Sequence, residues 1–181
     1  MEWIDEVKNR IKRGRIILFD RDSQPVAALY ERLCVADRRA VVIWALYFAE
    51  SCALRLKELG ERDQAKAFDA ILAAKMWAAG DIKMPEAKRA ILDCHAAAKE
   101  AQCAEAAALY RAAGQACSAV HTPRHAPGLY VYELTAYVLR YGVDGCKGKI
   151  EERAAEYLSR LENIEGHIGD YDFVRAKFLS R

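Results

Sequence analysis

Alanine is the feature of this sequence that most constrains the fold. The chain contains 33 alanines, and 22 of them lie between Ala65 and Ala126. Alanine is the best helix former, and its small side chain lets packed helices approach one another closely. β-branched residues, which favour strands, are sparse in the same stretch. The composition therefore predicts closely packed helices without a sheet.

Apolar residues recur at helical spacing along the chain, and capping residues mark where helices begin and end. The strongest segment follows Asp37, a good N-cap, and carries Trp44 and Phe48 on one face. Its other sides are apolar too, and a helix that is apolar on most sides is buried. We therefore expect a central helix that Gly60 closes.

Other segments predict breaks rather than helices. The short apolar run 15–19 has no partner strand, so we expect a connection. Two prolines break the chain at 121–127, and three glycines predict a loop at 142–148. A short last helix is expected to carry three apolar residues, Tyr171, Val174 and Phe178.

These segments together predict an all-α fold: a single-domain bundle of about eight or nine short antiparallel helices. The chain of 181 residues has the length of one domain, and no long linker divides it. Short connections make successive helices antiparallel neighbours. We therefore expect residues 1–181 to form a single helical domain.

Charge and cysteine usage exclude several classes of protein. The 28 basic and 26 acidic residues give a net charge of +2, which predicts no nucleic-acid partner. No run of apolar residues is long enough for a membrane span, and the first residues lack the apolar core of a signal peptide. The six cysteines form no CxxC pair, so we expect buried, reduced thiols and a cytoplasmic location. No oligomeric state is assigned.

One constellation could bind a metal. Cys117, His121 and His125 are spaced four residues apart, and His95 from the preceding helix could complete a tetrahedral zinc site. Pro123 interrupts the helix between two of them, so we expect His121 and His125 to diverge. We predict no bound metal or cofactor, and we expect His95 and His121 to be core histidines bonded to a helix end or a carboxylate.

Glu50 is the third candidate for a buried polar side chain, because it lies among small residues of the central helix. A functional interpretation makes it a general base near His95. The alternative is an ion pair with an arginine, or a position at an exposed edge, and we favour this alternative.

A resemblance to a known family covers Val42 to about Gly142. The chain resembles the immunity-protein-5-like family of bacterial polymorphic-toxin loci. The resemblance rests on the order and spacing of Trp44-Ala-Leu46, Ala49-Glu50, Met76-Trp-Ala-Ala-Gly-Asp-Ile82, His95-Ala-Ala-Ala98, Arg111-Ala-Ala-Gly-Gln-Ala-Cys-Ser118 and Ala119-Val-His-Thr-Pro-Arg-His-Ala126. Two positions depart from the family pattern: Gln115 stands where histidine is expected, and Tyr47 where aspartate is expected.

The resemblance implies a non-enzymatic protein that binds and neutralises a cognate bacterial toxin. Its natural interfaces are the surface of the first helix and the acidic segment 151–172, which could imitate phosphate if the toxin is a nuclease. Two alternatives remain. One is a small helical metal-binding or hydrolytic enzyme that uses Glu50, His95, His121 and His125, and the other is a general helical scaffold.

Overall fold

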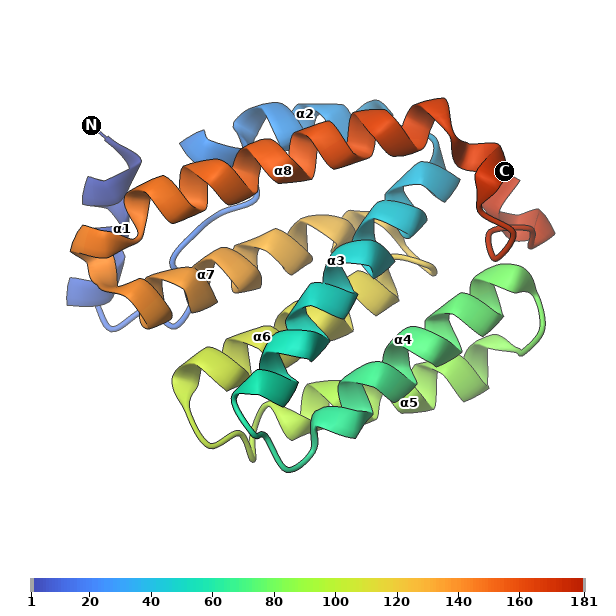
Figure 1. Ribbon diagram of the computed structural model, residues 1–181, viewed down its shortest axis with the longest axis horizontal. Helices are drawn as coiled ribbons and strands as arrows, with labels where there is room; N and C mark the ends of the chain where they lie inside the picture. The colour runs from blue at the N-terminus through green and yellow to red at the C-terminus, as the bar shows by residue number, and fades with distance from the viewer. Residues whose placement is uncertain (1, 181) are drawn as a thin grey trace.

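The computed structural model describes residues 2–180, which form eight α-helices and no strand (Figure 1). The predicted all-α bundle is confirmed. The helices are α1 (Trp3–Lys12), α2 (Ala27–Val35), α3 (Arg38–Glu58), α4 (Gln64–Ala79), α5 (Met84–Ala97), α6 (Ala104–Ser118), α7 (Ala126–Gly145) and α8 (Lys147–Gly166). Run 15–19 is an irregular connection, as expected.

Helix α3 crosses the middle of the bundle, as Figure 1 shows, and packs against α4, α6, α7 and α8. It begins as predicted, because the Asp37 carboxylate accepts a hydrogen bond from the Arg39 backbone N–H at 2.8 Å. Trp44 and Phe48 are fully buried. The Trp44 indole N–H also donates to the carbonyl of Tyr157 in α8, at 2.9 Å. The prediction of a buried central helix is therefore confirmed.

Helices α4 and α5 form an antiparallel hairpin beside α6. Gly80 ends α4 in the left-handed conformation, with φ of 86°, which a side chain would disfavour. The alanine-rich faces allow close packing, and a glycine marks the closest approach. A Cβ atom at Gly114 of α6 would lie 2.5 Å from Cε1 of His95 in α5. The ring of His95 therefore occupies the space that a side chain at position 114 would need.

The predicted loop at 142–148 is largely wrong. Only Gly142, with φ of 71°, leaves the helical conformation, and it kinks α7. The chain then returns to helix up to Gly145, and α8 begins at Lys147. Glycine content alone overestimated the break, because Gly145 and Gly148 adopt helical backbone angles.

The predicted last helix around Tyr171, Val174 and Phe178 is also wrong. This segment contains only short 3₁₀ turns, Ile168–Asp170 and Lys177–Ser180. Its backbone also bonds a neighbouring helix: the Ala176 N–H donates to the carbonyl of Ala78 at the end of α4, at 3.0 Å. The segment lies against the bundle and is held by such contacts.

The structure also describes the cysteines and the lengths of the apolar helices. All six cysteines are free thiols, and four are buried, whereas Cys34 and Cys103 are exposed. Among residues 2–180, no helix is both long enough and apolar enough to cross a bilayer.

Candidate functional site: the α5–α6 groove

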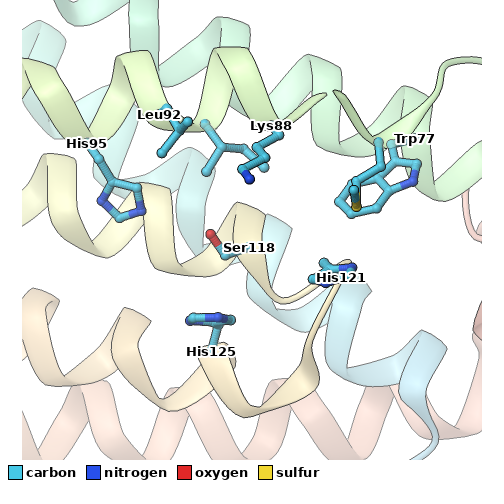
Figure 2. Close-up of a pocket in the computed structure, with 9 residues that line it drawn as sticks. Trp77, Lys88, Leu92, His95, Ser118, His121 and His125 are labelled. Atoms are coloured by element: carbon cyan, nitrogen blue, oxygen red, sulfur yellow. The ribbon is translucent and has the colours of Figure 1, made fainter. Parts of the chain in front are cut away.

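A cavity of about 250 Å³ opens between α5 and the C-terminal end of α6 (Figure 2). We call it the α5–α6 groove. It brings together three of the four candidate metal ligands, together with Trp77 from the end of α4. Its lining residues are Trp77, Met84, Lys88, Ile91, Leu92, His95, Ser118, His121 and His125.

Helix α5 supplies one wall of the groove. Met84, Lys88, Leu92 and His95 follow at intervals of four, four and three residues, so they share one face of the helix. Large apolar surface remains in solvent on this wall, because Met84 is 40% exposed and Leu92 is 55% exposed.

The opposite wall comes from the end of α6 and the turn before α7. The Ser118 hydroxyl donates to the Gly114 carbonyl at 2.8 Å, and Figure 2 shows this side chain pointing toward α5. The break at Pro123 is confirmed as a 3₁₀ turn, Pro123–His125. It does not separate the histidines as expected, since the turn folds back and both His121 and His125 line the groove.

His121 is not the core histidine that the sequence predicted. It is exposed, because it follows the end of α6 where the chain leaves the core. Its imidazole stacks on the indole of Trp77, with ring centroids 5.7 Å apart and an interplanar angle of 22°. The neighbour that orients His121 is therefore an aromatic ring.

His95 is half-buried, with its ring against Gly114 of α6. Burial lowers its pKa, and the nearby charges of His125 and Arg111 lower it further, while the backbone of Gly114 acts in the opposite direction. His95 is therefore a neutral imidazole near pH 7.

His125 is held by a neighbour across the groove wall. Its Nδ1 donates to the Gln115 side-chain carbonyl at 2.8 Å, because that oxygen can only accept. Gln115 reaches this position across Gly128, where a Cβ atom would lie 2.8 Å from the amide oxygen of Gln115. The residue that replaces the histidine of the family pattern thus orients His125.

Two predicted site residues lie elsewhere. Cys117 is fully buried, burial raises the pKa of its thiol, and it is not part of the groove lining. Glu50 is half-buried rather than buried, and it pairs with Lys75 of α4 instead of an arginine. Among the residues described, no group of three or more His, Cys, Asp or Glu side chains is placed to hold one metal ion.

The groove lining carries one positive charge, that of Lys88, without a matching negative one. The lining contains one lysine and three histidines, and no aspartate or glutamate. The lysines that form ion pairs within residues 2–180 are Lys66, Lys75, Lys147 and Lys149, so Lys88 is left without a carboxylate partner.

Sequence reasoning missed a buried ion pair, between Glu133 in α7 and Arg153 in α8. They are 3% and 8% exposed, and an Arg153 Nη2 donates to Glu133 at 2.5 Å. The Tyr157 hydroxyl donates to the other carboxylate oxygen. Burial raises the pKa of Glu133; burial opposes the charge of Arg153, yet the attraction of Glu133 raises its pKa. Both residues lie on the same helix face as the apolar residues of their helices, and this spacing in the sequence would have indicated that they are buried.

Comparison with known proteins gives one match. No curated protein and no solved structure matches the chain. The model of the family described as "Imm-5 like putative immunity protein" matches residues 31–160. This range covers more than half of the chain, from α2 to α8, and it contains every lining residue of the α5–α6 groove. The chain therefore belongs to the Imm-5 like family.

Proposed function

We propose that this protein binds a cognate bacterial toxin and neutralises it by protein–protein contact, without catalysis. Membership of the immunity-protein family over residues 31–160 carries this proposal. An immunity protein acts by occupying a surface of its toxin, which needs a stable interface of roughly 800 Å² on each partner.

The arrangement of side chains supports binding over chemistry. Glu50, the candidate general base, is paired with Lys75 and does not line the groove with the histidines. Exposed apolar side chains on α5, Met84 and Leu92, offer surface that a partner could cover.

Co-expression with a candidate toxin domain, taken from an open reading frame that neighbours the gene, tests this proposal. Cells that produce the toxin alone should stop growing, and cells that also produce this protein should grow. The purified proteins should form a complex that survives gel filtration. Unrelieved toxicity together with no complex would disprove the proposal.

A further inference from the structure

We infer that the α5–α6 groove is the place where the toxin docks, and that the docking segment carries a large apolar side chain beside carboxylates. This inference rests on the proposed function and adds the chemistry of the partner. The groove combines an apolar wall, a cavity and unpaired positive charge in one place.

The first feature of the groove is a small cavity beside exposed apolar side chains. A cavity of about 250 Å³ is smaller than the roughly 300–1,000 Å³ of sites for drug-sized ligands, so it suits one or two side chains. Ile91 forms part of its buried floor, whereas Met84 and Leu92 stand exposed at its edge. A partner side chain inserted there would bury the exposed apolar surface and displace water from it.

The second feature of the groove is that the charge of Lys88 has no carboxylate partner within residues 2–180. On the two surfaces that the sequence favoured, several acidic and basic side chains pair within the chain: Arg10 contacts Glu6, Arg153 contacts Glu156, and Arg32 contacts Glu165. At the groove, Lys88 has no such partner and the imidazoles of His121 and His125 lie nearby. A carboxylate that approaches Lys88 would be attracted by its positive charge.

The same features argue against other occupants. A basic segment would meet Lys88 without a compensating acid in the lining. A free nucleic acid would need a broader basic surface than one lysine and three histidines provide, and the net charge of the chain is only +2. An acidic, partly apolar protein segment matches both the wall and the charge.

Four substitutions test the inference against the same candidate toxin domain. Leu92→Glu places a negative charge on the apolar wall, which would repel an acidic segment. Lys88→Glu replaces the unpaired positive charge with a negative one. The matched controls are Leu72→Glu on α4, where Leu72 is 59% exposed and outside the groove, and Lys12→Glu on α1. All four positions are on the surface, so thermal melting should confirm an unchanged fold.

We expect each groove variant to raise the Kd by about tenfold or more, as truncation of a central interface residue does. Each control should stay within about twofold of the wild type. Raising the salt concentration should weaken the wild-type complex, and Lys88→Met should reduce that dependence.

The outcomes separate the two proposals. If the wild type binds and the groove variants bind equally well, the groove inference is wrong and the proposed function stands. If Leu92→Glu weakens binding but Lys88→Glu strengthens it, the acidic partner is excluded. If the wild type neither protects cells nor forms a complex, both proposals fail together.

Discussion

Glu133 and Arg153 place opposite charges inside the bundle, between α7 and α8. Their attraction offsets the cost of removing both from water, and Tyr157 satisfies the remaining carboxylate oxygen. Such a pair is costly to break on one side, because the surviving charge stays buried without compensation. Substituting either residue alone therefore destabilises the protein mainly because the charge of the other residue stays buried without a partner.

Arg153→Met should lower the free energy of unfolding by about 3–5 kcal/mol, because it leaves Glu133 charged and unpaired in the core. The double variant Arg153→Met, Glu133→Gln should recover part of this loss, since glutamine carries no charge and still accepts from Tyr157. Urea unfolding measures both values. A double variant less stable than the single one would contradict this account.

His95 predicts a pH dependence of stability. Its pKa in the folded protein lies below the ordinary value of 6.5, so the unfolded chain takes up a proton first as the pH falls. The free energy of unfolding should therefore decrease below about pH 6.5, and His95→Gln should reduce this decrease. Urea unfolding at about pH 7.5 and about pH 5.5 measures the difference. Equal slopes for the two proteins would show that His95 contributes nothing.

At the scale of elements, α5 and α6 are held at the distance that Gly114 permits. Gly114→Ala should destabilise the protein by about 1–3 kcal/mol, because the new Cβ would overlap the ring of His95. The matched control is Gly148→Ala in α8, where a Cβ meets nothing within 4 Å. This control should be neutral or stabilising, since alanine favours helix over glycine. Thermal melting that ranks the two variants in the opposite order would refute the close approach.

Sequence patterns predicted those elements that depend on local signals. Helix α3 was predicted because Asp37 caps it and apolar residues surround it, and both signals act within the element. The segment around Phe178 was mispredicted, because its conformation depends on the carbonyl of Ala78, about a hundred residues away in the chain. The loop predicted at 142–148 was too long, because only Gly142 leaves the helical conformation there.

At the scale of the whole molecule, Trp44 joins the central helix to α8 through its hydrogen bond and through ring contacts with Phe48 and Tyr157. Trp44→Ala should cost about 3–5 kcal/mol of the free energy of unfolding. Denaturant unfolding followed by circular dichroism checks this value. A loss below about 1 kcal/mol at unchanged helix content would mean that the bundle closes around the missing ring.

The groove could be predicted only in part. The sequence singled out His95, His121 and His125, and the structure places all three on one cavity. Their arrangement depends on the chain reversal at Pro123 and on the approach of α5 to α6, which no local pattern encodes. Glu133 escaped attention because a charged residue in a helix is usually solvated, although its place on the apolar stripe of α7 was a signal of burial.

Because His121 stacks on Trp77, the intrinsic fluorescence of Trp77 reports on the groove. Of the three tryptophans in the chain, Trp44 is sealed in the core and Trp3 packs against Phe19, so Trp77 alone lines the groove. The emission of an indole responds to a stacked imidazole, and the response changes when the imidazole gains charge or moves away. A partner that binds between α5 and α6 therefore changes the fluorescence of Trp77, without any attached label.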